Sequence, residues 1–323
     1  MNLPPTATQN FARRVYAAFF ARPAARVYAG SAFYILHFTF YIFLSSCSPA
    51  PENPQIPKSP NPQIRIVSLA PNLTESLAVI NALPFLVGRT FHCDYPAEAL
   101  AEIPSTGLFG EPDLERVIAL RPTHVVYTDL RDKTIHDTLC RFGINVVQIP
   151  CERLDEIAPA IRVLGELTGR AADAGAFATH LETRLAELRA ASEKIPDAER
   201  PDAFFFLGDS PLYTVGRDSF ITDLLYLAGG RNIAADTATA YFPATPEIFI
   251  SRNPGILIPI YDAPPGTLHK NLSQHPGWAA TRAIRENRVI EGLPLDLLTR
   301  PGPRVLEAIE ALREALERLK KDE

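Results

Sequence analysis

Residues 175–194 read GAFATHLETRLAELRAASEK, and this stretch decides how the rest of the chain is interpreted. Its large apolar residues recur at the spacing of one helix face, with charged residues on the other faces, and they are Phe177, Leu181, Leu185 and Leu188. Beyond its first residue the stretch is rich in alanine and poor in glycine. It therefore predicts one long, stiff helix. This helix is either a surface helix of a single domain or a helix that joins two lobes.

The sequence before this helix alternates apolar runs with amphipathic segments. Apolar runs that read as buried strands stand at 65–69, 86–88, 124–128 and 145–149, and helical periodicity stands at 113–120 and 135–142. The segment after the first run turns into a helix that Asn72 or Thr74 could cap, with Glu75 in its first turn. This alternation predicts an α/β lobe with a mainly parallel sheet.

A second series of the same kind follows the long helix. Strands are expected at 202–207, 255–260 and 288–290, and helices at 219–227 and 304–320. The two halves share a local pattern in which a short helix with a glutamate is followed by arginine, proline and an apolar strand. We therefore expect two α/β lobes of one kind, at residues 64–165 and 199–323, joined by a helix at 166–198.

The first 47 residues have the pattern of a lipoprotein signal peptide. Four arginines and no acidic residue precede an apolar run at 32–44, which has about the length of a secretory h-region and is short for a membrane span. The run ends in Leu44-Ser45-Ser46-Cys47, which resembles a bacterial lipobox. We expect export, lipidation of Cys47 and tethering at the cell envelope, with the proline-rich residues 48–63 as a spacer. An uncleaved membrane anchor is the alternative.

Composition argues against several functions. Cleavage before Cys47 removes four arginines and moves the formal net charge from −5 to −9, which argues against a nucleic-acid partner. The other cysteines, Cys93, Cys140 and Cys151, allow at most one intramolecular disulfide and are expected to be packing residues. The histidines show no ligand-like spacing, and common catalytic motifs are absent. We therefore expect no catalytic residues, no metal site and no intrinsic cofactor.

Five stretches, in this order, resemble one protein family: RIVSLAPNLTE at 65–75, CDYPAEA at 93–99, PDLERVIALRP at 112–122, HPGW at 275–278 and RPGPR at 300–304. They resemble the helix-backbone class of ABC-importer binding proteins, which take cobalamin, ferric siderophores or haem, and the second stretch resembles the cobalamin branch. The resemblance implies the class III periplasmic-binding-protein fold, with two Rossmann-like lobes joined by a single long rigid helix. It also implies a monomer that captures cobalamin or a related corrinoid between its lobes and delivers it to a permease dimer.

The same resemblance implies two sets of site residues. Glu115 and Glu247, one in each lobe, correspond to glutamates that meet arginines on the permease, although each could be an ordinary solvated helix charge. The implied ligand-binding residues are Tyr95, Phe109, Tyr213, Tyr241, Phe242, Asp296 and Arg300. Aromatic faces suit a broad macrocycle, and an Asp–Arg pair offers acceptors and donors to amide groups. The aromatic residues could equally be core residues, and the Asp–Arg pair only a local salt bridge.

Two alternatives stay open. The nearer one is a ferric-siderophore or haem-binding protein of the same family. A siderophore would require an arginine cluster, and the sequence does not place Arg89, Arg217 or Arg252 in one. For haem or cobalt, His92 could serve as an axial ligand. The other alternative is an exported enzyme, which no motif supports.

Overall fold

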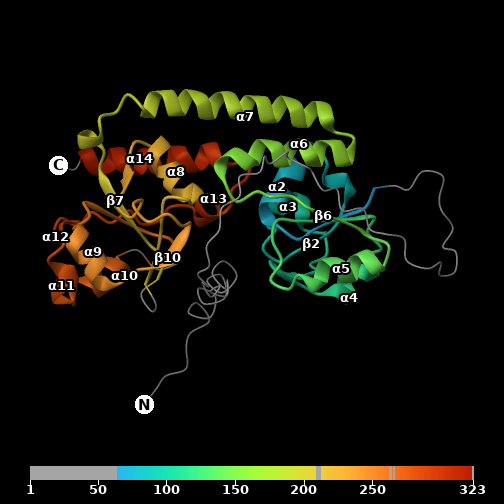
Figure 1. Ribbon diagram of the computed structural model, residues 1–323, viewed down its shortest axis with the longest axis horizontal. Coiled ribbons are helices and arrows are strands. Elements are labelled where there is room, and N and C mark those ends of the chain that lie inside the picture. The colour runs from blue at the N-terminus through green and yellow to red at the C-terminus, as the bar shows by residue number, and fades with distance from the viewer. Residues whose placement is uncertain (1–63, 209–211, 262–263, 265, 322–323) are drawn as a thin grey trace, which may run out of the picture.

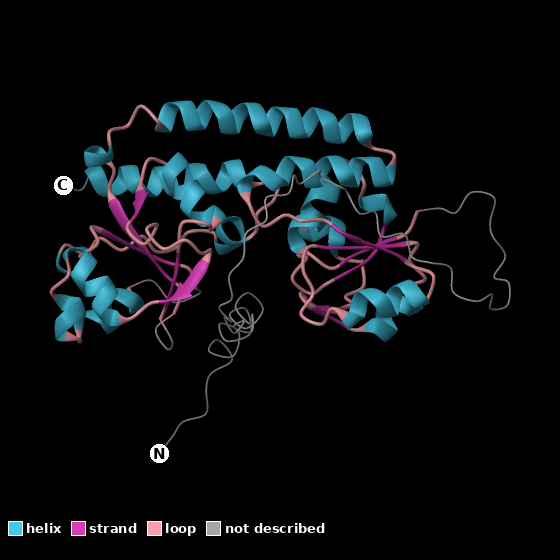
Figure 2. Cartoon of the chain, in the orientation of Figure 1, coloured by secondary structure: helices cyan, strands magenta, loops and turns pink. Residues whose placement is uncertain are grey.

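The computed structural model describes residues 64–208, 212–261, 264 and 266–321. The expected signal peptide, the lipidation site Cys47 and the spacer lie outside these residues. Two lobes lie side by side beneath a layer of long helices (Figure 1). Figure 2 shows that the strands of both lobes lie on the same side of this helical layer. Within the described ranges, no helix combines the length and apolar character needed to cross a membrane.

The N-terminal lobe is built on a parallel four-stranded sheet in the order β2-β1-β5-β6. Its strands are β1 (Ile66–Ser68), β2 (Leu86–Arg89), β5 (His124–Tyr127) and β6 (Asn145–Gln148). The connections are α2 (Pro71–Val79), η1 (Leu83–Phe85), α3 (Ala97–Leu100), α4 (Leu114–Ala119), α5 (Thr134–Arg141) and a hairpin of β3 (Gly107–Leu108) and β4 (Glu111–Pro112). The inner strand β1 is buried along its whole length, as expected for a parallel sheet covered on both faces.

The C-terminal lobe contains a parallel sheet in the order β11-β7-β9 and a separate antiparallel pair, β10-β8. The strands are β7 (Asp202–Phe206), β8 (Tyr213–Val215), β9 (Arg231–Asn232), β10 (Tyr241–Pro243) and β11 (Ile256–Pro259). The helices are η3 (Asp197–Glu199), α8 (Phe220–Leu227), α9 (Pro246–Arg252), α10 (Thr267–Ser273), α11 (Pro276–Ala279), α12 (Arg282–Arg285), α13 (Leu295–Thr299) and α14 (Val305–Lys321). The side chains of Phe204, Phe205 and Phe206 are almost completely buried, so β7 is packed on both faces.

The long helix is α7 (Ala171–Ser192), which lies over both lobes (Figure 1). It follows η2 (Leu154–Glu156) and α6 (Ile157–Thr168), and α6 ends where Gly169 adopts a left-handed φ of 70°. The two helices pack closely, because a Cβ atom placed on Gly165 of α6 would lie 2.3 Å from the Cβ of Ala174 in α7. Further along, α7 contacts α8 and α14 of the C-terminal lobe.

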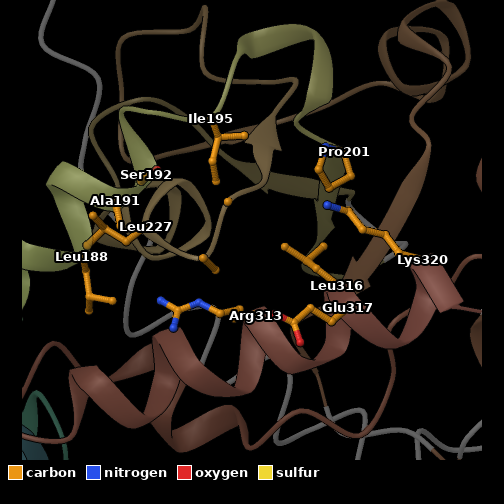
Figure 3. A pocket seen from close by; sticks show the side chains of 12 residues that line it. Leu188, Ala191, Ser192, Ile195, Pro201, Leu227, Arg313, Leu316, Glu317 and Lys320 are labelled. Atoms are coloured by element: carbon orange, nitrogen blue, oxygen red, sulfur yellow. The ribbon is translucent and has the colours of Figure 1, made fainter.

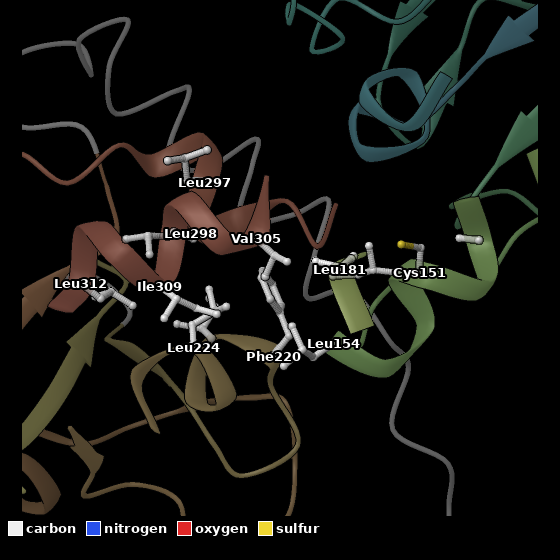
Figure 4. Packing of buried hydrophobic residues seen from close by; sticks show 14 of the residues in the cluster. Cys151, Leu154, Leu181, Phe220, Leu224, Leu297, Leu298, Val305, Ile309 and Leu312 are labelled. Carbon is white, nitrogen blue, oxygen red and sulfur yellow. The ribbon is translucent and has the colours of Figure 1, made fainter. Parts of the chain in front are cut away.

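One hydrophobic cluster extends through both lobes. It includes Leu73 of α2, Leu154 of η2, Leu181 of α7, Phe220 of α8 and Ile309 of α14. Figure 4 shows Phe220 between Leu154 and Val305, where parts of both lobes meet. Because the apolar contact is continuous across the junction, the lobes and the helical layer are held as one packed unit.

Three sequence predictions need correction in detail. The long helix does not fill residues 166–198, because the left-handed Gly169 separates α6 from α7. Residues 288–290 form only an isolated bridge between Leu257 and Val289, not a strand. Neither Asn72 nor Thr74 caps α2, because the helix already begins at Pro71 with Ala70 as its N-cap. Instead, the Asn72 amide donates to the carbonyl oxygens of Cys151 and Pro301, tying α2 to the C-terminal segment.

Candidate functional site

The candidate site is centred on Arg300, directly after α13. Its guanidinium lies 2.8 Å from Oδ1 of Asp296, one helical turn earlier. The same group lies 2.6 Å from Oδ1 of Asp94 and 3.2 Å from Oε1 of Glu75, and both of these carboxylates belong to the N-terminal lobe. Arg300 therefore joins three carboxylates from two parts of the fold.

Arg304 completes this group. Its Nε and Nη2 donate to the two carboxylate oxygens of Glu75 at 2.9 and 2.8 Å, which is a bidentate pair. Its guanidinium carbon also lies 3.8 Å from the ring centroid of Tyr95, a cation–π contact. The Tyr95 residue remains 44% exposed. The structure therefore brings together three of the residues expected from the sequence, Tyr95, Asp296 and Arg300. It adds three that were not selected: Glu75, Asp94 and Arg304.

Charges within this group compensate one another. Burial opposes ionisation of Asp94, but the hydrogen bond and charge of Arg300 outweigh it and lower the pKa of that carboxyl. Burial would lower the pKa of Arg300, yet its hydrogen bond to Asp94 and the charges of Asp296, Asp94 and Glu75 raise it. Three carboxylates thus face two guanidinium groups, and neither arginine carries an uncompensated charge.

The loop after β2 adds aromatic surface next to this group. The Phe91 backbone N–H donates to the Gly107 carbonyl at 2.8 Å, and the Phe109 N–H donates to Nδ1 of His92 at 3.3 Å. Phe91 and His92 are in edge contact, with ring centroids 5.7 Å apart. Phe91 is 64% exposed, whereas Phe109 is half-buried. Phe91 was not selected from the sequence, although its position beside the Cys-Asp-Tyr-Pro stretch was a usable signal.

His92 lies within reach of the same charges. Burial lowers its pKa, the charge of Arg300 lowers it further, and Asp94 and Asp296 act in the opposite direction. A backbone N–H can only donate, so the Nδ1 atom facing Phe109 must be an acceptor. In the neutral ring the proton therefore resides on Nε2.

The three aromatic residues expected in the C-terminal lobe lie on β8 and β10. Tyr241 pairs with Val215, and Phe242 pairs with Thr214. Because successive strand residues point to opposite faces, Tyr241 packs against the cluster that joins the lobes and Phe242 packs against a second cluster. Tyr213 lies on the Tyr241 side. Burial raises the pKa of Tyr241 to about 12, against a smaller opposing effect of a hydrogen bond with Ser219.

Glu115 and Glu247 occupy matching positions in the two lobes. Each is the second residue of a short helix, α4 or α9, and each is exposed. Both helices lead to a residue with left-handed backbone, Arg121 with φ 48° or Asn253 with φ 46°, then to a proline and a parallel strand. A hydrogen bond with the Thr245 hydroxyl lowers the pKa of Glu247, so that carboxylate is ionised at neutral pH.

Two of the cysteines are buried, and the described residues contain no metal-binding cluster. Cys93 and Cys151 are buried thiols without a disulfide partner, and burial raises the pKa of Cys151 to about 12. In the part of the chain that the structure describes, no three His, Cys, Asp or Glu side chains are grouped as a metal site would require.

A cavity of about 250 Å³ lies elsewhere, between the end of α7, α8 and α14 (Figure 3). It is lined by the apolar side chains of Leu188, Leu227 and Leu316 and also by Arg313 and Lys320. None of the ligand-binding or docking residues expected from the sequence lines it.

Comparison with known proteins gives the class. Residues 66–294 match the family model described as periplasmic binding protein. A Bacillus subtilis relative, the uncharacterized ABC transporter substrate-binding lipoprotein YvrC, is 27% identical over 257 residues, which cover 78% of this chain and 79% of the relative. The vitamin B12-binding protein of Vibrio parahaemolyticus is 28% identical over 265 residues, covering 80% and 92%.

Among solved structures, the periplasmic heme-binding protein RhuT from Roseiflexus sp. RS-1 in apo form has a similar fold. Its TM-score is 0.68 at 24% identity, and the match covers 78% of this chain and 99% of that one. The chain belongs to the periplasmic binding protein family. It is therefore a binding protein and not an enzyme, and the class III fold and family resemblance expected from the sequence are confirmed.

Proposed function

We propose that this chain is the substrate-binding protein of an ABC importer and that it binds cobalamin or a related corrinoid between its two lobes. The observation that carries the proposal is the charge pairing around Arg300. The guanidinium groups of Arg300 and Arg304 are both already paired with carboxylates, namely those of Glu75, Asp94 and Asp296. Two relatives are named as an ABC transporter substrate-binding lipoprotein and a vitamin B12-binding protein, which supports the importer role.

The charge balance favours a ligand with neutral polar edges. Asp94 and Asp296 are 54% and 53% exposed, so their carboxylates remain accessible as hydrogen-bond acceptors. Such acceptors suit the N–H groups of carboxamides and repel carboxylates. The rings of Phe91 and Tyr95 are both exposed, and their faces suit contact with a macrocycle. A corrinoid carries both features, an extended ring and carboxamide side chains.

A siderophore is less well supported because other arginines have local partners. Arg252 forms an ion pair with Asp236 at 2.9 Å, and Arg217 lies 3.8 Å from Asp218. Arg89 donates to the backbone carbonyls of Leu100 and Thr90. These arginines do not supply the cluster of cationic groups that an anionic siderophore needs.

Haem is the second candidate, because a heme-binding structure shares the fold and exposed aromatic rings also suit a porphyrin. Two observations weigh against it. The propionate groups of haem would meet the carboxylates of Asp94 and Asp296. His92 accepts the Phe109 N–H on Nδ1 and carries its proton on Nε2, so neither nitrogen offers a lone pair to iron while that hydrogen bond holds.

The deciding experiment is a calorimetric titration of the full chain, purified in detergent, with cyanocobalamin. Haemin and a ferric siderophore serve as comparators. Saturable one-to-one binding of cyanocobalamin that Tyr95→Ala or Arg300→Ala weakens would support the proposal. Tight binding of haemin or the siderophore without cobalamin binding would contradict the corrinoid assignment and leave the importer role in place.

Two further parts of the proposal concern location and docking. Cys47 is proposed as the acylated residue that anchors the chain at the cell envelope, which mass spectrometry of the membrane-extracted protein would test. Glu115 and Glu247 are proposed to contact the permease dimer, one from each lobe. Two exposed carboxylates on a stiff frame give orientation more than affinity.

A further inference from the structure

Glu75 is a buried acidic side chain that contacts two arginines. It lies on α2, within the N-terminal lobe, and its side chain is only 2% exposed. Both of its oxygens accept hydrogen bonds from Arg304, at 2.8 and 2.9 Å, and Oε1 also accepts one from Arg300 at 3.2 Å. A buried carboxylate is costly unless opposite charge and hydrogen bonds compensate it, and here two guanidinium groups do so.

Each of these arginines has a second partner nearer the protein surface. Arg300 also contacts Asp94 and Asp296, whose side chains are about half exposed. Arg304 stacks on Tyr95, which is likewise partly exposed. Each arginine therefore contacts the buried Glu75 carboxylate on one side and a residue proposed to touch the ligand on the other.

We propose that Glu75 is a positioning residue of the ligand site: it fixes the guanidinium of Arg300 and, through Arg304, the ring of Tyr95. This inference rests on the proposed function. Arginine side chains have many rotamers, and ordering them on binding weakens affinity. Because Glu75 already orders the side chains of Arg300 and Arg304 in the free protein, little further conformational entropy is lost from them when the ligand binds.

The competing explanation is that Glu75 only joins the lobes, as any buried ion pair would. Both explanations predict some loss of stability in Glu75→Gln, so stability cannot distinguish them. They differ in ligand binding. If Glu75 acts through Arg304 and Tyr95, the effects of changing Glu75 and Tyr95 must be non-additive.

The experiment is a double-mutant cycle of Glu75→Gln and Tyr95→Leu in the full chain, with cyanocobalamin affinity measured calorimetrically well below the unfolding temperature. We expect Glu75→Gln to weaken binding at least about tenfold, because it leaves the arginines without their shared buried carboxylate. Tyr95→Leu should then cost much less in the Glu75→Gln background than in the wild type. Additive losses, or a Glu75→Gln affinity equal to that of the wild type, would overturn the proposal.

Glu310→Gln is the matched control. Glu310 forms a similar carboxylate–arginine contact, 3.2 Å from Arg313, but it is exposed on α14 and not part of the candidate site. We expect its cyanocobalamin affinity to stay within about twofold of the wild type, since exposed ion pairs contribute little. An equal loss in Glu310→Gln would mean that any carboxylate–arginine pair matters, which would also overturn the proposal.

A ligand-free measurement separates failure of this inference from failure of the proposed function. In NMR spectra of the arginine side chains, the Arg304 Nε–H should exchange slowly in the wild type and rapidly in Glu75→Gln. If wild type binds no cobalamin, the corrinoid proposal fails and this signal alone tests whether Glu75 orders Arg304. Equal exchange in both proteins would reject the ordering.

If Glu75→Gln does not fold, Arg304→Lys replaces it. Lysine keeps the positive charge but loses the planar fork and the stacking on Tyr95. We expect weaker cyanocobalamin binding and the same non-additivity with Tyr95→Leu. Wild-type affinity in Arg304→Lys would contradict the proposed route from Glu75 through Arg304.

Discussion

At the residue scale, Phe91 and Phe142 form a natural pair for testing the ligand site. Both are strongly exposed, at 64% and 61%, but Phe91 lies beside His92 and Phe142 follows α5 elsewhere in the lobe. We expect Phe91→Ala to weaken cyanocobalamin binding by about 1 kcal/mol, roughly fivefold in dissociation constant, through loss of aromatic contact. Phe142→Ala should bind as the wild type does.

The measurement is a calorimetric titration of both variants beside the wild type. Neither substitution should change the free energy of unfolding by more than about 0.5 kcal/mol, since both rings are largely solvated. Equal affinities in the two variants would remove Phe91 from the site and favour Tyr95 as the main aromatic contact of this lobe.

His92 gives a pH-dependent prediction. Its pKa is lowered in the folded protein, chiefly by burial, whereas in the unfolded chain it lies near 6.5. Between these values the unfolded state binds the proton more readily, so the free energy of unfolding decreases as pH falls from 7.5 to 5.5. Chemical denaturation should show a smaller decrease for His92→Gln. His124 shifts in the same direction, so a slope remains in the variant. An unchanged slope would show that His92 does not contribute.

The family resemblance was enough to select Tyr95, Asp296 and Arg300, but the sequence could not show that Glu75 contacts Arg300. These residues are far apart in the chain, and their contact depends on how the C-terminal segment packs against α2. For Phe109 and Phe242 the sequence suggested a ligand contact but could not show how far each ring is buried or which way it points. An aromatic residue in a motif can be half-buried, and only the strand register reveals that Phe242 points away from Tyr241.

At the element scale, the contact between α6 and α7 depends on one glycine. A Cβ on Gly165 would meet the Cβ of Ala174 at 2.3 Å, whereas a Cβ on Gly175, one residue further along α7, would meet nothing within 4 Å. Gly165→Ala should destabilise the protein by about 1–3 kcal/mol through overpacking. Gly175→Ala should stabilise it by up to about 1 kcal/mol, because alanine is the better helix former.

Chemical denaturation of the two variants measures both effects in the same helix pair. Opposite signs would confirm that α6 and α7 pack through Gly165. A stabilising Gly165→Ala substitution would show that the helix pair accommodates the added methyl group and does not require glycine at this contact.

Element boundaries were the least predictable part of the fold. The periodicity of Leu181, Leu185 and Leu188 was enough to predict a long helix, because residues on one helix face recur at fixed spacing. It did not place the helix start, which depends on the left-handed turn at Gly169. Residues 288–290 have strand-like composition, but only Val289 pairs, with Leu257. The backbone N–H of Arg288 donates instead to the Ala283 carbonyl at 2.7 Å.

At the scale of the whole molecule, the two lobes are not independent bodies joined by a tether. The cluster containing Leu154, Leu181, Phe220 and Ile309 runs through both lobes, and the Asn72 amide and the Glu75 carboxylate join α2 to residues 300–304. A frame of this kind keeps distant surface groups at a fixed separation. Because the two lobes are similar and packed into one frame, equivalent surface residues of the two lobes are held at a fixed distance from each other.

Glu115 and Glu247 are such points, each the second residue of an equivalent short helix. We expect Glu115→Gln and Glu247→Gln to leave cyanocobalamin affinity within about twofold, and each to reduce permease-dependent uptake less than about fivefold, because one exposed ion pair contributes at most about 1 kcal/mol. The double variant should lose about the product of the two effects, since each glutamate would meet a different permease subunit.

Glu98→Gln is the control, because Glu98 is also an exposed glutamate in the first turn of a helix, α3. Uptake of labelled cobalamin in cells that contain the permease is the measurement. If Glu98→Gln reduces uptake as much as Glu115→Gln, the effect is one of net negative charge and not of docking position. If the double variant is no worse than the more affected single variant, only one lobe contacts the permease, and the two-point arrangement that a rigid frame makes possible is not used.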